Sequence, residues 1–295
     1  MSYRELLNQK LRDAPVHSAP FPHVQLTDVL PEDVLADILA HWPQPDEFEP
    51  EWGNSTRGWR LLVHDDKIFA PPGARHQEFW ESVTRSHLTP FIEALAERFS
   101  PFWALRYGGP VQRLNVVQLC CFTASPEFVF HPPHHHSNHG PHWLFTGLLY
   151  LDDNGGVDRG TRLYRVNGLE TFRDREFYNL LANDGAAPVE PAHDSGFRTN
   201  GMLAFLDSPV SFHGSTPFDT NVDARGERKI IRMHVAASLE DFQRAFGIPS
   251  PDEYREAVSR YRETHQPETL EPYRNQIERE EQLVMSRNQG PATHY

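Results

Sequence analysis

Histidines are concentrated in one short segment in the middle of this chain. The segment HPPHHHSNHGPHW, residues 131–143, holds six of the chain's seventeen histidines. Prolines and a glycine interleave them and apolar runs flank them, so the segment is not a terminal purification tag. Neutral imidazole is the commonest metal ligand among the side chains. The cluster therefore predicts a transition-metal site, with a solvated loop that binds no metal as the alternative.

A metal site needs ligands that the fold brings together from separate segments. In a β-barrel the strand ends converge at the mouth, where ligands from one strand end meet a ligand from a distant strand. His213 follows the apolar run NGMLAFLD and is a candidate for the distant ligand. Arg228 begins the next apolar run, RKIIRMHV. Taken alone, His213 is better explained as a buried, hydrogen-bonded core histidine than as a ligand.

The elements that would position these residues are short strands. From Arg113 onward the chain has apolar runs rich in β-branched and aromatic residues, separated by turn signals: LNVVQLCCF, WLFTGLLYL, TRLYRV, NGMLAFLD and KIIRMHVAAS. This pattern predicts an antiparallel sandwich or barrel over 113–237, with a helical insertion near 169–183. Residues 1–112 are predicted to be an N-terminal helical segment that packs on this core. Residues 238–295 are predicted to form charged C-terminal helices.

Composition restricts the class of protein. The formal net charge is −13 at pH 7, which gives no general attraction to nucleic acid or to anionic lipid. No stretch is apolar enough to span a membrane, and the N-terminus has no apolar leader. The two cysteines, Cys120 and Cys121, are adjacent inside an apolar run, which indicates packing residues in a reducing compartment. We therefore expect a cytoplasmic protein that binds neither nucleic acid nor membranes.

Five motifs occur in an order typical of one enzyme family. They are PHHHSN at 133–138, LFTGLLYLDD at 144–153, GTRLY at 160–164, NGMLAFLDSPVSFHG at 200–214 and RKIIRMHV at 228–235. This order resembles the Fe(II)/2-oxoglutarate-dependent oxygenases, which have a double-stranded β-helix (jelly-roll) core. The resemblance spans roughly residues 20 to 240 and implies a mainly β fold with flanking helices. It also implies an oxidoreductase, a dioxygenase that uses Fe(II) and 2-oxoglutarate.

The resemblance assigns roles to four residues. Matching PHHHSN to the family's PHTDSP segment makes His134 and His136 the two proximal metal ligands, and His213 the distal one. Arg228, at the start of the last strand, would bind the far carboxylate of 2-oxoglutarate through its planar fork. The implied partners are O₂ and a small-molecule substrate, whose identity would be set by loops.

The chain departs from the family at the proximal pair. The family has His-x-Asp or His-x-Glu, whereas no acidic residue lies between Glu127 and Asp152. With His134 and His136 as the pair, a histidine replaces the carboxylate, and the site carries one more positive charge. A small residue that leaves room for halide is also absent, which disfavours halogenation.

Other alignments of this segment remain open. One makes His136 and Asn138 the pair, and another puts His139 at the carboxylate position with Ser137 as its partner. For the oxo acid, Arg232 is the alternative to Arg228, because it lies on the same face of the strand.

Three functions are compatible with these motifs. The first is a nonheme iron hydroxylase that depends on 2-oxoglutarate and acts on a small molecule or metabolite. The second is a three-histidine iron dioxygenase that needs no oxo acid. The third is a metal- or ligand-binding jelly roll without catalysis. The charged C-terminal helices are predicted to be exposed faces, a lid or the contact of a homodimer.

Overall fold

A computed structural model describes most of the chain up to residue 241. The described residues are 3–51, 56–64, 67–71, 73–107, 111–123, 136, 143–152, 160–166, 189–208, 211–215, 227–238 and 240–241. The predicted helical insertion and nearly all of the predicted C-terminal helices lie outside these ranges, as do His134, Asn138 and His139.

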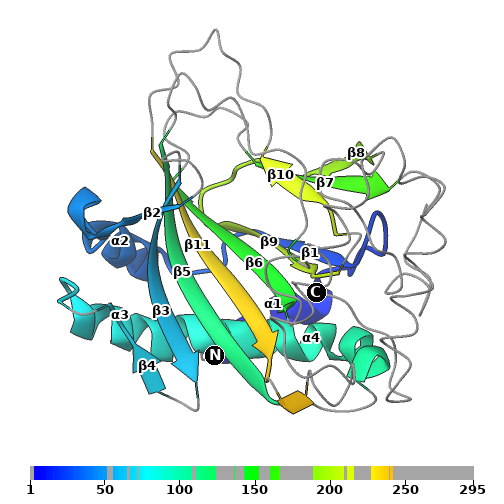
Figure 1. Cartoon of the computed structure of the whole chain (residues 1–295), viewed down its shortest axis with the longest axis horizontal. Coiled ribbons are helices and arrows are strands. Elements are labelled where there is room, and N and C mark those ends of the chain that lie inside the picture. The colour runs from blue at the N-terminus through cyan, green and yellow to red at the C-terminus, as the bar shows by residue number, and fades with distance from the viewer. Residues whose placement is uncertain are drawn as a thin grey trace, which may run out of the picture.

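The larger of two β-sheets has eight strands, all paired antiparallel (Figure 1). In spatial order they are β1 (His23–Leu26), β9 (Gly201–Leu206), β6 (Trp143–Asp152), β11 (Glu227–Ala237), β5 (Arg113–Thr123), β3 (Thr56–His64) and β2 (Glu49–Glu51), with β4 (Lys67–Phe69) also paired to β3. The smaller sheet has the order β10 (His213–Ser215), β7 (Thr161–Val166) and β8 (Val189–Asp194).

The order of these strands is that of a double-stranded β-helix. After β6 the chain crosses to the small sheet for β7 and β8, returns for β9, crosses again for β10 and returns for β11. The centre of the large sheet is therefore β9-β6-β11-β5, in which no strand lies beside its neighbour in sequence. A chain that passes repeatedly from one sheet to the other in this way forms a jelly roll. The predicted fold class is confirmed.

Burial on both faces explains the unbroken apolar run of β6. Phe145 and Leu149 face the helical side of the large sheet and belong to the main hydrophobic core. Leu148 and Tyr150 face the other way and pack with Leu163 of β7 in a second core between the sheets. Each such burial stabilises the fold by roughly 1.5–3 kcal/mol. A strand that is buried on both faces has no polar alternation, as its sequence indicates.

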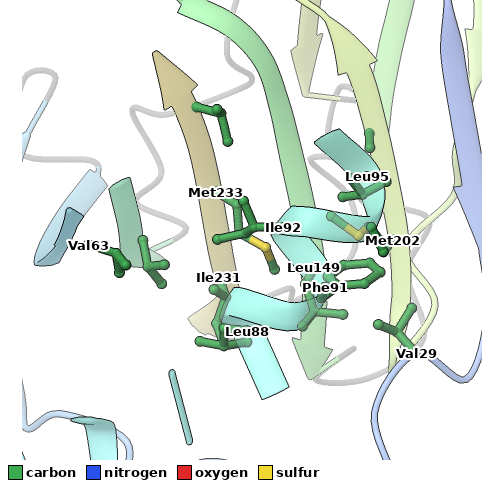
Figure 2. Packing of buried hydrophobic residues seen from close by; sticks show 14 of the residues in the cluster. Val29, Val63, Leu88, Phe91, Ile92, Leu95, Leu149, Met202, Ile231 and Met233 are labelled. Atoms are coloured by element: carbon green, nitrogen blue, oxygen red, sulfur yellow. The ribbon is translucent and has the colours of Figure 1, made fainter. Parts of the chain in front are cut away.

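Helices cover the outer face of the large sheet. They are α1 (Tyr3–Asp13), α2 (Glu32–Ala40), the short η1 (Pro45–Glu47), α3 (Gln77–Val83), the π-helical segment η2 (Thr84–Leu88) and α4 (Thr89–Tyr107). Figure 2 shows Phe91, Ile92 and Leu95 of α4 packed against Ile231 and Met233 of β11 and their neighbours. None of the described helices is long and apolar enough to cross a membrane.

The segment before residue 113 contains strands as well as the predicted helices. β3 extends the large sheet beyond β5 over nearly its whole length, from Arg57 opposite Cys121 to Val63 opposite Asn115. β4 follows β3 as a hairpin, with Leu62 opposite Phe69. The π-helical segment η2 separates α3 from α4, and Pro90 is the second residue of α4.

Gly160, just before β7, is required by close backbone contact. A Cβ at this position would lie 2.5–2.6 Å from backbone atoms of Gly196. We expect Gly160→Ala to lower the free energy of unfolding by about 1–3 kcal/mol, because the backbone itself must move. Gly147→Ala is the matched control, since the closest atom to its Cβ would be the flexible tip of Met202. Urea unfolding of both variants tests this, and equal midpoints would contradict it.

Candidate metal centre

Three histidines from different segments gather between the two sheets. His213 is the first residue of β10 on the small sheet, and His234 lies on β11 of the large sheet. The ring of His136 lies between them, with its centroid 4.5 Å from that of His213 and 5.0 Å from that of His234. Both pairs of rings are nearly perpendicular, at 75° and 78°.

A buried carboxylate and a buried hydroxyl link two of these rings. Asp207, just after β9, is fully buried, and its Oδ1 lies 2.8 Å from Nδ1 of His136. The hydroxyl of Thr146 on β6 donates to Asp207 Oδ2 at 2.6 Å. The same hydroxyl lies 2.9 Å from Nδ1 of His234 and 3.1 Å from Nδ1 of His136. The four side chains thus form one hydrogen-bonded network.

The donors and acceptors of this network fix where the protons lie. Thr146 has one proton, which goes to Asp207, so its oxygen must accept from Nδ1–H of His234. A carboxylate oxygen accepts, so Nδ1–H of His136 donates to Oδ1 of Asp207. Burial, followed by the nearby charges of Arg232 and other groups, lowers the pKa of His234 well below its usual value. His234 is therefore neutral, with its lone pair on Nε2.

His213 is oriented in the same way by the backbone. Its Nδ1 lies 2.9 Å from the carbonyl oxygen of Ser211, to which Nδ1–H donates. Its lone pair is therefore also on Nε2. Metal-binding histidines in proteins almost always donate their second ring N–H to a carboxylate, a carbonyl or a similar acceptor. All three histidines have this arrangement, with Asp207, Thr146 and Ser211 as the acceptors for His136, His234 and His213.

The spacing of the rings fits a transition metal. Metal–nitrogen distances of about 2.1 Å put the metal roughly 3.2 Å from each ring centre, so ligands at about 90–110° have ring centres about 4.5–5.2 Å apart. The distances from His136 to its two neighbours lie in this range. The set of nitrogen donors suits Fe(II), Zn(II) or Cu(II) better than Mg(II) or Ca(II).

Ligand atoms of His136, Asp207 and His234 also lie within 4.8 Å of one another, which would allow these three to bind a metal directly. The hydroxyl of Thr146, however, lies within hydrogen-bond distance of all three residues and fills the space between them. We interpret Asp207 and Thr146 as groups that orient the imidazoles of His136 and His234. His213 does not belong to the set whose ligand atoms all lie within 4.8 Å of one another, so it lies beside this group.

A cavity of about 820 Å³ adjoins the histidine group. His136, His234 and Trp143 line it, and Arg232 of β11 lies opposite Gln118 of β5 in its wall. The remaining lining comes from Val116 of β5 and from the N-terminal segment between Glu47 and Pro71. The histidine group therefore faces a space large enough for a small molecule.

The structure brings together two of the residues predicted to bind metal. His136 and His213 are neighbours, whereas His134 and the alternatives Asn138 and His139 lie outside the described residues. Arg228 is on β11 opposite Phe122 of β5, and its side chain is not described.

Asp207, Thr146 and the role of His234 were not predicted from the sequence. The missing carboxylate was expected within the histidine cluster, whereas Asp207 comes from the end of another strand, six residues before His213. A signal for His234 was present, since it alternates with Arg232 and Arg228 on one strand face. The fold thus brings a buried carboxylate next to His136, which donates a hydrogen bond to it.

A second group of histidines lies on the other side of Phe205. The buried His23 on β1 packs 5.0 Å from His17 and 4.8 Å from His193, measured between ring centroids. Its Nδ1 bonds to the carbonyl oxygen of Phe21. Burial, opposed by this hydrogen bond and assisted by repulsion from His193 and His17, lowers the pKa of His23 to about 4.

This lowered pKa predicts a pH dependence of stability. Between pH 6.5 and 4 the unfolded state binds a proton at His23 that the folded state does not, so stability falls as the pH falls through this window. The expected loss is roughly 3 kcal/mol, at 1.36 kcal/mol per pKa unit. His23→Gln should remove this part of the dependence while still donating to Phe21. Chemical denaturation from pH 7 to 4 is the measurement, and parallel curves for the two proteins would contradict the prediction.

Comparisons with known proteins give similar folds only. No protein-family model matches the chain, and no curated protein is significantly similar to it. A prolyl-4-hydroxylase structure from Pseudomonas putida is 13% identical with a TM-score of 0.44, covering 79% of this chain and 100% of its own. A prolyl hydroxylase from Trichoplax adhaerens, in complex with a peptide of hypoxia-inducible factor, is 13% identical with a TM-score of 0.46, covering 80% and 90%.

A dioxygenase for auxin oxidation from Arabidopsis thaliana is 12% identical with a TM-score of 0.40, covering 80% of this chain and 90% of its own. At these identities and TM-scores the similarity carries no argument about activity. The fold assignment rests on the strand order itself.

Proposed function

We propose that this protein is a nonheme Fe(II) oxygenase that uses 2-oxoglutarate and hydroxylates a small molecule. The observation that carries the proposal is the group of His136, Asp207 and His234, whose ligand atoms lie within 4.8 Å of one another, with His213 next to His136, inside a double-stranded β-helix. His136 and His234 also line a cavity. The order of the five sequence motifs supports it. The net charge of −13 also favours a small-molecule substrate over nucleic acid.

His136 and His213 are the two candidate ligands that the motif order names and whose rings lie next to each other. The motif implies His134 as the third ligand, and the structure brings His234 next to His136. Three protein ligands on a six-coordinate Fe(II) leave positions for a bidentate 2-oxo acid and for O₂. The carboxylate of Asp207, bonded to His136, offsets part of the positive charge of an all-imidazole site and makes His136 a stronger donor.

The protein's own groups would bind and orient the reactants. Bound Fe(II), with O₂ and a 2-oxo acid, supplies the oxidation of an aliphatic carbon together with release of CO₂ and succinate. Arg228, at the start of β11, would hold the distal carboxylate of 2-oxoglutarate with its planar fork. Thr146 and Asp207 keep the imidazoles in one tautomer, so that their nitrogen donors stay directed toward the metal.

The test is anaerobic calorimetry of 2-oxoglutarate binding to the Fe(II)-loaded protein. Arg228→Ala should weaken binding roughly 30-fold, because truncating one partner of a desolvated charge pair costs about 2 kcal/mol or more. Iron affinity should not change, and Arg228→Lys should recover part of the loss. With O₂ and a substrate, wild-type protein should form succinate. If Arg232→Ala and not Arg228→Ala removes the oxo acid, Arg232 is the anchor.

The all-imidazole donor set also favours a second candidate, a three-histidine iron dioxygenase that needs no oxo acid. Such an enzyme would bind Fe(II) and consume O₂ with its substrate, and would neither bind 2-oxoglutarate nor form succinate. Arg228 on β11 would then have no dicarboxylate to bind, and for this reason we prefer the first function. A protein that binds metal but never consumes O₂ would be the non-catalytic jelly roll.

A further inference from the structure

The cavity beside the metal centre extends outward to the hairpin of β3 and β4, beyond the barrel strands. The register places side chains in rows across β3, β5 and β11, and two adjacent rows line the cavity: Arg60, Gln118 and Arg232, then Leu62, Val116 and His234. A polar row that contains two arginines therefore lies beside a largely apolar row on one wall.

The outer end of this wall is apolar and exposed. Leu62 and Phe69 are direct partners across the β3–β4 hairpin, both line the cavity, and they are 37% and 52% exposed. Among the described residues, the other large hydrophobic residue with comparable exposure is Leu6, on α1. Apolar side chains in the lining of a cavity suit an apolar part of a bound ligand.

The polar row contains a guanidinium in a fixed orientation. Gln118 is buried, and its Oε1 accepts hydrogen bonds from both Nε and Nη2 of Arg232. These two bonds hold the plane of the guanidinium at the cavity wall. A planar fork held in one orientation recognises a carboxylate more specifically than a mobile point charge does.

We infer that the substrate is an amphipathic carboxylic acid, whose carboxylate binds Arg232 and whose apolar body lies along Val116 and Leu62 toward Phe69. That the bound acid is oxidised rests on the proposed function, whereas its binding does not. Glu47 and Glu49 also line the cavity, which disfavours a second anionic group such as a phosphate dianion at that end. A volume of about 820 Å³ accommodates a compact organic acid.

Arg228 and Arg232 would then serve different carboxylates. They lie four residues apart on β11, which separates their Cα atoms by about 13 Å at roughly 3.3 Å per residue. At this separation the two side chains cannot both bind the same carboxylate with the same geometry. Arg228 would hold the oxo acid at the beginning of the strand, and Arg232 the substrate at the cavity wall.

Trp59 and Trp143 line the cavity, so tryptophan fluorescence of the metal-free protein reports binding. The probes are 4-phenylbutyrate, the neutral 4-phenylbutyramide and the cationic 4-phenylbutylamine. We expect the acid to bind at least about tenfold more tightly than the other two, since hydrogen bonds to a charged partner contribute about 1.5–3 kcal/mol. Arg232→Gln should remove this preference and leave the affinity for the amide unchanged.

Phe69→Ser and Leu62→Ser should weaken the acid and the amide equally, whereas Leu6→Ser, the exposed control on α1, should leave both unaffected. The inference would be overturned if all three probes bound with equal affinity or if none of them bound. It would also be overturned if Arg232→Gln lost 2-oxoglutarate binding but still bound the acid. Failure of the protein to bind Fe(II) while it still binds the acid through Arg232 would refute the proposed function alone.

Discussion

His136→Ala is expected to weaken Fe(II) binding by roughly 100-fold or more. Apparent binding free energies of protein metal sites reach roughly 10–16 kcal/mol with four ligands, so one ligand carries about 3 kcal/mol or more. His136 is the residue on which the centre depends most, because its ring lies next to both His213 and His234 and its Nδ1 bonds to Asp207. The measurement is competition for Fe(II) against a chelator under anaerobic conditions.

The matched control is His193→Ala, in the second histidine group on the other side of Phe205. It removes a half-buried imidazole that bonds to Gln25 and should leave iron affinity unchanged. His213→Ala should behave like His136→Ala, and comparison of His134→Ala with His234→Ala identifies the third ligand. If His136→Ala and His213→Ala both still bind Fe(II), the metal does not bind at this histidine group.

Asp207→Asn is expected to lower Fe(II) affinity by roughly 10- to 100-fold, the range typical of removing a group that orients a metal-binding histidine. The amide can accept from His136 but must then donate to Thr146, whose hydroxyl would turn to donate to Nδ1 of His234. That change moves the proton of His234 to Nε2, where it blocks the lone pair. Asp207→Asn should also be less stable, because a buried charge-assisted hydrogen bond is replaced by a neutral one.

Thr146→Val tests separately the hydrogen bond that orients His234 and the one that orients His136. It removes the acceptor of His234 but leaves the bond between Asp207 and His136. If His234 is the third ligand, Thr146→Val should weaken iron binding, and if His134 is the third ligand the effect should be small. Calorimetric iron binding, combined with unfolding by urea, distinguishes loss of orientation from loss of fold. An Asp207→Asn protein with unchanged iron affinity would contradict an orienting role.

Much of the fold could be predicted because its strands carry strong local signals. LFTGLLYL has the composition of a doubly buried strand, and the apolar runs around it are too short and too closely punctuated by turns to be helices. The order of the motifs indicated the jelly-roll arrangement. The role of the N-terminal segment was harder to predict, since β3 is a single apolar run among helices, and only its pairing with β5 makes it a wall of the cavity.

Part of the candidate site could be read from a motif, and the rest depends on how the fold assembles it. His136 and His213 follow from the motif order, and the structure brings them together. Asp207 belongs to another strand, and no local spacing relates it to His136, so the compensating charge is visible only in three dimensions. The exposed apolar pair in the cavity lining likewise depends on the register of the β3–β4 hairpin, which places Leu62 opposite Phe69.

The most direct test of the proposed metal centre is an anaerobic titration of the protein with Fe(II) and then with 2-oxoglutarate, followed by visible absorption. The proposed centre predicts that the wild-type chain binds one equivalent of Fe(II) and that the oxo acid then produces a metal-to-ligand charge-transfer band, absent from His136→Ala. Iron that binds without producing this band would contradict the use of 2-oxoglutarate. Wild-type protein that retains no Fe(II) would contradict the metal centre itself.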